Sequence, residues 1–190
     1  MRQIPRVAIL GNPNCGKTAI FNLLTGLNQK VSNYPGITVE KKIAKVKIQN
    51  DAFNLEDYPG SYSMISQSID EKIVSDNIYS WIRQPDSKPD AIVYVADINN
   101  IRRNLYFCTQ LLELDIPTVI LLNMSDILIK ENDFDYIKLK EELNVLNVIP
   151  FSAVNHTGVN VLKDTLIDLF NNPLETKNKR LQETIKLQKR

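Results

Sequence analysis

Hydrophobic positions along this chain form short β-branched runs that alternate with longer segments of helical period. Strands are predicted at residues 7–10, 43–49, 52–56, 91–96, 118–123 and 147–150. Helices are predicted between them, at residues 17–25, 70–82, 104–114, 136–143 and 159–170. Such alternation is typical of a mostly parallel sheet covered by helices on both faces. The predicted fold is therefore an α/β domain built on a mostly parallel six-stranded sheet.

The second and third predicted strands are expected to pair as an antiparallel hairpin. Only Asn50 and Asp51 separate them, whereas a parallel crossover needs a dozen or more residues. The sheet is therefore expected to contain one antiparallel strand.

Composition supports one water-soluble domain. The chain has 190 residues, of which 43% are hydrophobic and 24% charged, a balance typical of globular proteins. The longest apolar run, 116–122, is far shorter than the roughly 18 to 20 residues that cross a bilayer, and residues 1–5 lack a signal-peptide core. Cys15 and Cys108 are the only cysteines, which makes a structural disulfide improbable. A cytoplasmic location is expected for the isolated domain.

A basic tail follows the predicted core. Residues 173–190 hold six Lys or Arg and two Glu, so the remaining chain carries a charge of about −3 at neutral pH, which argues against nucleic-acid binding as its main task. We expect a nucleotide-binding domain at 1–172 and a charged tail at 173–190. A weak apolar stripe in the tail fits either the start of a helical domain or a solvated C-terminal helix.

The strongest motif is the stretch from Gly11 to Thr18, which matches G-x-x-x-x-G-K-[ST] between a predicted strand and a predicted helix. Backbone amides of such a P-loop bind phosphate oxygens. Lys17 is expected to reach the β- and γ-phosphates, and the Thr18 hydroxyl to ligate magnesium. A chance glycine turn is the weaker interpretation because the pattern is long and correctly placed.

Further motifs follow later strands. Asp57 and Gly60 form D-x-x-G after the third strand, where the carboxylate can hold magnesium and the glycine amide can bond the γ-phosphate. A plain β-turn would be the alternative elsewhere in the chain. Asn123, Met124 and Asp126 form a variant of N-K-x-D after the fifth strand. A carboxylate there can accept both guanine N–H groups, which favours GTP over ATP.

The polar stretch at residues 29–40 is predicted to be a mobile switch. Thr38 is its only threonine and is the candidate to bind magnesium and the γ-phosphate. The residues expected to contact nucleotide are Gly11, Asn12, Asn14, Cys15, Gly16, Lys17, Thr18, Ala19, Gly36, Ile37, Thr38, Asp57, Gly60, Asn123, Met124, Asp126, Ser152, Ala153 and Val154. Together these motifs predict a small-GTPase-like G domain that binds GTP or GDP with Mg²⁺.

Over residues 4–170 the chain resembles the N-terminal cytosolic G domain of the bacterial ferrous iron transporter FeoB. The resemblance rests on the P-loop and on residues 33–42, 57–63, 70–72 and 103–106. It implies a regulatory GTPase at the cytoplasmic face of the bacterial inner membrane, with a transmembrane permease region and a following helical domain as partners. A homo-oligomer is also considered, and no nucleic-acid partner is expected. Departures are Tyr34 for the usual Trp, Cys15 for the frequent Ser, and Met124 for the Lys of N-K-x-D.

Hydrolysis is expected to be slow, because Ser61 stands where Ras-type enzymes place a water-orienting glutamine. The switch stretch also lacks an arginine. The resemblance implies that Asn14 helps to hold a potassium ion in place of an arginine finger. The expected catalytic residues are Asn14, Lys17, Thr38 and Gly60, and the expected metal ligands are Thr18, Thr38 and Asp57 for magnesium and Asn14 for potassium.

Two other functions fit the same motifs. One is an RNA- or ribosome-associated GTPase, since the fold does not fix the partner. The other is a sensor that binds GTP with little turnover. Among residues that invite a special role, Cys15 is expected to be a small P-loop residue, Cys108 a core residue and His156 a solvated one. With two distant cysteines and one histidine, no iron-binding cluster is expected.

Overall fold

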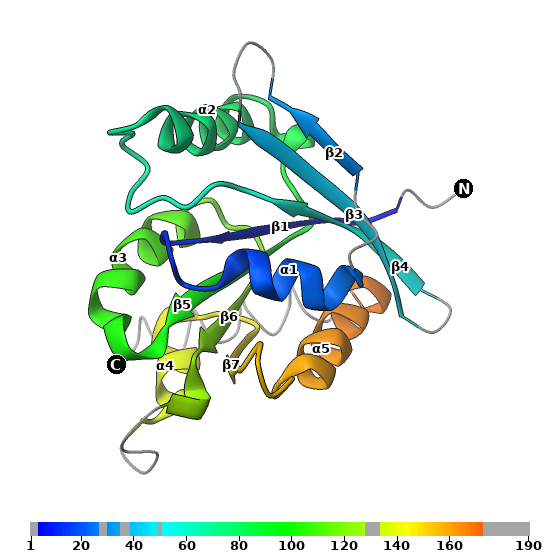
Figure 1. Ribbon diagram of the computed structural model, residues 1–190, viewed down its shortest axis with the longest axis vertical. Coiled ribbons are helices and arrows are strands. Elements are labelled where there is room, and N and C mark those ends of the chain that lie inside the picture. The colour runs from blue at the N-terminus through cyan, green and yellow to red at the C-terminus, as the bar shows by residue number, and fades with distance from the viewer. Residues whose placement is uncertain (1–3, 27–29, 35–38, 49–50, 128–133, 173–190) are drawn as a thin grey trace.

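One mixed sheet organises the computed structural model, which describes residues 4–26, 30–34, 39–48, 51–127 and 134–172 (Figure 1). The strands are β1 (Arg6–Gly11), β2 (Lys30–Asn33), β3 (Glu40–Ile48), β4 (Asp51–Asp57), β5 (Ala91–Asp97), β6 (Thr118–Asn123) and β7 (Asn147–Pro150). The helices are α1 (Lys17–Thr25), α2 (Ile69–Arg83), α3 (Ile101–Leu112), α4 (Tyr136–Leu143) and α5 (Val159–Asn171). Short 3-10 turns lie at η1 (Pro85–Ser87), η2 (Ile98–Asn100) and η3 (Ser125–Ile127).

The sheet has seven strands within these residues, in the order β2-β3-β4-β1-β5-β6-β7, so the prediction of six was wrong. The added strand, β2, pairs with β3 along the sheet edge. Its only apolar residue, Val31, is 50% exposed. Backbone pairing rather than burial holds the strand, which is why hydrophobic periodicity gave no signal for it. The predicted antiparallel hairpin is confirmed: β3 pairs antiparallel with β4, and Ile48 lies opposite Asp51.

Alternating side chains along the central strands supply two separate cores. Val7 and Ile9 of β1 pack on the face that α1 and α5 cover, whereas Ala8 and Leu10 pack on the face of α2 and α3. Figure 1 shows these helix pairs on opposite sides of the strands. Each fully buried large aliphatic side chain contributes roughly 1.5 to 3 kcal/mol. Because the two cores contain residues of different helices, the prediction of helices on both faces of the sheet is confirmed.

The switch residues Gly36, Ile37 and Thr38 and the tail at 173–190 lie outside the described residues. Among the residues that are described, no helix is both long and apolar enough to cross a bilayer.

Candidate functional site

Polar loops collect at one edge of the sheet. Strands β1, β4, β5, β6 and β7 run parallel, so their carboxyl ends meet at the same edge. The P-loop follows β1, the D-x-x-G turn follows β4, the Asn123–Asp126 motif follows β6, and Ser152–Ala153 follows β7. Ligands of open α/β sheets bind at such an edge.

The P-loop backbone adopts conformations that its glycines permit. Gly11 has φ +152 and Gly16 has φ +93, and Asn14 between them has φ +62. A Cβ on Gly11 would lie 2.2 Å from the Val95 carbonyl oxygen. The loop therefore presses on β5 at its start, which only a residue without a side chain allows.

The first turn of α1 keeps its backbone N–H groups free of side-chain caps. Gly16 occupies the N-cap position of α1 and provides no side-chain hydrogen bond, whereas Ser68 caps α2 and Asp135 caps α4. The first N–H groups of a helix have no partner within it and attract anions together with the helix dipole. At α1 they remain available for phosphate.

Lys17 is buried at the base of the loop. It is 8% exposed, and its Nζ donates to the Asn12 carbonyl oxygen at 2.8 Å. Burial lowers the pKa of Lys17, and the neighbouring Cys15 and Asp57 oppose that shift. A buried ammonium group gains most from an anionic partner.

Gly60 packs directly against the P-loop. A Cβ on Gly60 would lie 2.7 Å from Pro13 Cα and 3.1 Å from Lys17 Nζ. The Ser61 amide donates to the Gly11 carbonyl at 3.2 Å. The Ser61 hydroxyl is turned back to the Ser63 carbonyl at 2.7 Å, so this side chain is engaged within its own loop.

Asp57 has the character of a cation ligand. Its Oδ1 is buried and has no hydrogen-bond partner among the described residues. Burial raises the pKa of Asp57 to about 6, against the influence of Lys17 and Lys42. A carboxylate that is both desolvated and unpartnered is the chemistry that a hard divalent cation satisfies. Magnesium therefore fits this position, with the exposed Thr18 available at the start of α1.

Asn123 joins the phosphate and base loops. Its Nδ2 donates to the Cys15 carbonyl at 2.9 Å, and its Oδ1 accepts from the Ala153 amide at 3.3 Å. Ser125 binds the Phe151 carbonyl through its hydroxyl at 2.9 Å. Three loops are thus held in one arrangement by neutral hydrogen bonds.

The remaining residues of the predicted base site lie around this centre. Met124 has φ +65, which turns the chain after β6, and Asp126 is exposed in η3. Ser152 is buried, and its hydroxyl accepts from the Asn155 amide at 3.1 Å. Val154 is 80% exposed.

Cys15 and Cys108 are buried free thiols. Burial raises the pKa of Cys15, and it raises that of Cys108 to about 12, so neither thiol forms a thiolate at neutral pH. His156 is exposed. In the described part of the chain, no three His, Cys, Asp or Glu side chains gather into a metal-binding group.

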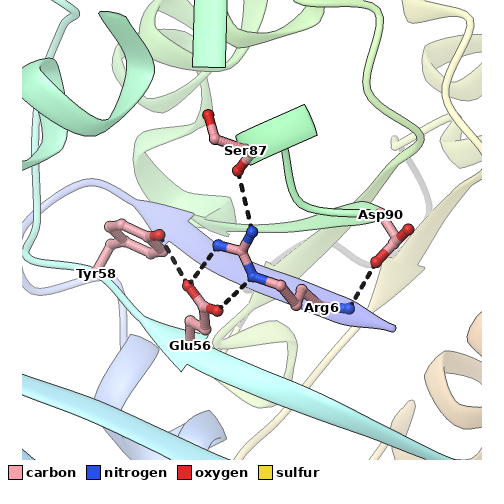
Figure 2. Close-up of polar contacts among 5 residues, drawn as sticks. All are labelled: Arg6, Glu56, Tyr58, Ser87 and Asp90. Atoms are coloured by element: carbon pink, nitrogen blue, oxygen red, sulfur yellow. Dashed lines mark hydrogen bonds and ion pairs between the residues drawn. The ribbon is translucent and has the colours of Figure 1, made fainter. Parts of the chain in front are cut away.

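A partly buried ionic network beside the D-x-x-G turn escaped the sequence analysis (Figure 2). Arg6 contacts both carboxylate oxygens of Glu56, at 2.8 and 3.3 Å, and Tyr58 donates to Glu56 at 3.0 Å. Burial opposes ionisation of Glu56, but Arg6 and Tyr58 hold its pKa below the usual value. The guanidinium also reaches the Ser87 carbonyl, and the Arg6 amide reaches Asp90. The available signal was Glu56, a charged residue that follows Leu55 inside the predicted strand 52–56.

Glu71 was a second omission from the predicted site. Its carboxylate accepts from the amides of Tyr62 at 3.2 Å and Gln67 at 2.7 Å. It therefore organises the loop between Gly60 and α2. The sequence placed this residue only within a family motif at the start of a helix.

Comparison with known proteins points to one family. The model of the family described as ferrous iron transport protein B matches residues 5–166. The Fe(2+) transporter FeoB of Leptospira biflexa is 37% identical over 161 residues, which cover 84% of this chain and 22% of that protein. The chain therefore spans about a fifth of the length of this curated relative.

Solved structures agree with this match. A GDP-bound mutant of the S. thermophilus FeoB G domain is 42% identical with a TM-score of 0.74, over 85% of this chain and 60% of that one. The G domain of the T. maritima FeoB iron transporter is 34% identical with a TM-score of 0.75, over 87% of this chain and 98% of that one. The predicted P-loop G-domain fold is confirmed.

Proposed function

The chain belongs to the ferrous iron transport protein B family, and from that premise we propose that it is a GTP-binding regulatory domain that hydrolyses GTP slowly to GDP and phosphate. Its parent is a bacterial Fe(II) transporter, and the domain lies at the cytoplasmic face of the inner membrane. It acts there on a permease region and a following helical domain. Residues 1–172 form the nucleotide domain and 173–190 its tail. The family match favours this function over an RNA-associated GTPase.

The observation that carries the proposal is the position of Asn123. It bonds the P-loop at Cys15 and the base loop at Ala153. The distance between phosphate and base sites is thereby fixed before a ligand arrives. Preorganised sites of this kind bind at a lower ordering cost, and a ligand that carries both phosphate and a base can use both loops at once.

Each proposed role follows from the chemistry of the group. The P-loop amides and Lys17 bind the β- and γ-phosphates. The Gly60 amide donates a hydrogen bond to the γ-phosphate, and the Asp126 carboxylate accepts hydrogen bonds from guanine. A magnesium ion at Thr18, Thr38 and Asp57 would supply positive charge to the phosphate oxygens. Because Ser61 is engaged with Ser63, it leaves the attacking water without a side chain to orient it. Slow turnover follows from that loss.

Replacing Asp126 tests base recognition. We expect Asp126→Asn to lose GTP affinity by about 10- to 150-fold, since a hydrogen bond to a charged group contributes roughly 1.5 to 3 kcal/mol. Xanthine nucleotide should gain, because its O2 accepts from the new amide. Competition of labelled GDP by GTP, ATP and XTP measures both changes. Asp86→Asn, in η1, is the matched control and should keep the preference for GTP. If ATP competes as well as GTP against the wild type, the proposed function is wrong.

Potassium is the proposed substitute for an arginine finger. Asn14 is exposed in the P-loop, and a potassium ion held by its side-chain oxygen would supply positive charge near the bridging phosphate oxygen. An arginine finger accelerates hydrolysis roughly 10³- to 10⁵-fold, and we expect about tens-fold from this weaker cation.

Turnover in matched potassium and sodium chloride provides the measurement. The wild type should respond to potassium, whereas Asn14→Ala should hydrolyse GTP equally slowly in both salts. A potassium response that survives in Asn14→Ala would contradict the role of Asn14, and equal wild-type rates would contradict potassium stimulation itself.

A further inference from the structure

Tyr94 is a polar residue in the middle of a buried strand. Residues 91–96 of β5 are all buried, and Tyr94 is 0% exposed. Its ring packs edge-on against Phe107 of α3, with centroids 6.1 Å apart. A buried phenol loses hydration and therefore needs a hydrogen-bond partner. Phenylalanine would satisfy the packing alone, so the hydroxyl calls for its own explanation.

The hydroxyl has two acceptors but only one proton. It lies 3.0 Å from Asn12 Oδ1 in the P-loop and closer still to the Asn104 carbonyl oxygen in α3. A phenol O–H can donate to one of them at a time. The shorter contact favours donation to Asn104, which leaves the lone pairs of the hydroxyl facing the Asn12 amide.

Asn12 has a side-chain donor that lacks an acceptor. The residue is 1% exposed, and its Nδ2 has no hydrogen-bond partner among the described residues. A half-turn of the Asn12 amide exchanges two atoms of nearly equal shape. Nδ2 then donates to the Tyr94 hydroxyl, which donates to the Asn104 carbonyl. This arrangement pairs Asn12 Nδ2 and the Tyr94 hydroxyl in one row, and it moves Asn12 Oδ1 to the position where Nδ2 had no partner.

Asn104 extends the row into the start of α3. It is 4% exposed, its Oδ1 accepts from the Asp97 amide at 3.2 Å, and its Nδ2 donates to the Asn100 carbonyl at 2.9 Å. The connection between β5 and α3 is therefore built around this side chain.

The other end of the row lies beside Lys17. The Asn12 carbonyl accepts from Lys17 Nζ at 2.8 Å. A shift of the ammonium group toward phosphate would therefore weaken the hydrogen bond that holds the Asn12 backbone. Helix α3 also contacts the loop after Gly60: Arg103 lies over the Tyr62 ring at 4.2 Å, and Gln110 accepts from the Met64 amide at 2.9 Å. Helix α3 is thus linked to the P-loop through Tyr94 and to the loop after Gly60 through its own side chains.

We propose that Tyr94 is a positioning residue that couples the P-loop to helix α3 through the row Asn12 amide, Tyr94 hydroxyl and Asn104 carbonyl. The proposal rests on the proposed nucleotide binding, which supplies the displacement at Lys17. Occupation of the phosphate site is then transmitted to the first turns of α3 without passing through the loop after Gly60.

The test compares Tyr94→Phe, which removes only the hydroxyl, with Thr118→Val. The control removes another buried hydroxyl, that of the first residue of β6, which donates to the Ile116 carbonyl. GDP affinity, thermal unfolding, and hydrogen exchange at residues 100–108 with and without GDP are measured for each protein. In the wild type and in Thr118→Val, GDP should slow exchange in this segment.

Tyr94→Phe should bind GDP about 2- to 12-fold more weakly, the equivalent of one net hydrogen bond, and lose the slowing of exchange. A wild-type exchange response in Tyr94→Phe would overturn the proposal, and so would an equal loss in Thr118→Val. Failure of the wild type to bind GDP would instead overturn the proposed function.

A double-mutant cycle with Asn12→Ala gives an independent answer. If one row of hydrogen bonds acts as a unit, Tyr94→Phe should cost little further GDP affinity once Asn12 is replaced. Additive losses would contradict the coupling. Should Tyr94→Phe be too unstable to purify, Asn12→Ala tests the row from its other end and must lose the exchange response of α3 in the same way.

Discussion

Lys17→Ala is expected to weaken GTP binding by about 10²- to 10⁴-fold. Two charge-assisted hydrogen bonds to phosphate, each worth roughly 1.5 to 3 kcal/mol, are lost with the ammonium group. The protein itself should remain folded. The charge of Lys17 is desolvated, as its lowered pKa indicates, so removing it relieves a burial cost in the absence of ligand.

Titration calorimetry with GTP and GDP, together with thermal unfolding without nucleotide, separates loss of binding from loss of fold. Lys138→Ala is the matched control, because this lysine lies on the surface of α4 and its ammonium group forms an exposed pair with Glu142. Thr18→Ala should resemble Lys17→Ala when magnesium is present. An affinity for Lys17→Ala within a factor of about three of the wild type, under 1 kcal/mol, would remove this residue from the site.

Gly16→Ala is expected to weaken nucleotide binding strongly by displacing a neighbouring side chain. The new Cβ would lie 2.2 Å from Asn123 Nδ2, at a backbone φ of +93. Asn123 must move, and its bonds to Cys15 and Ala153 break together. Lost hydrogen bonds and backbone strain add up to roughly 3 to 4 kcal/mol, or about 10²- to 10³-fold in affinity.

Gly26→Ala separates strain from collision. Gly26 also has a positive φ, +59, but a Cβ there meets nothing within 4 Å. This variant should lose about 1 kcal/mol of unfolding free energy from the left-handed backbone and keep nucleotide affinity unchanged. Denaturant unfolding and calorimetry on both variants give the comparison. Equal nucleotide affinities of the two variants would refute the bridging role of Asn123.

Much of the fold could be predicted because it depends on local patterns. The bounds of α1, α4, β6 and β7 agree with the predicted ones, since each begins or ends where hydrophobic periodicity stops at glycine, asparagine or proline. The short connection between β3 and β4 dictated their antiparallel pairing. Strand β2 was missed because backbone pairing with β3, between residues 7 to 13 positions apart in the chain, holds it, and such pairing leaves no hydrophobic pattern in the sequence.

Some residues of the candidate site could also be named from local sequence patterns, whereas the contacts of others depend on the fold. Gly11, Lys17 and Thr18 could be named from the sequence because a P-loop is a continuous segment whose function resides largely in its own backbone. Asp57 could be named as a candidate because it lies at the end of a strand. Asn123 was found for its place in the base motif, yet its contacts with Cys15 and Ala153 required the folded chain to bring three loops together.

Sequence by itself therefore determined the class of fold, the phosphate loop and the family, because these follow from periodicity and from contiguous motifs. Tertiary structure alone decided how buried polar groups are paired. Glu56 meets Arg6 from 50 residues away, and Tyr94 meets Asn12 from 82 residues away. A polar residue in a predicted buried strand indicates that its side chain needs a hydrogen-bond partner. The identity of that partner depends on strand order and register, which bring distant residues within hydrogen-bond distance.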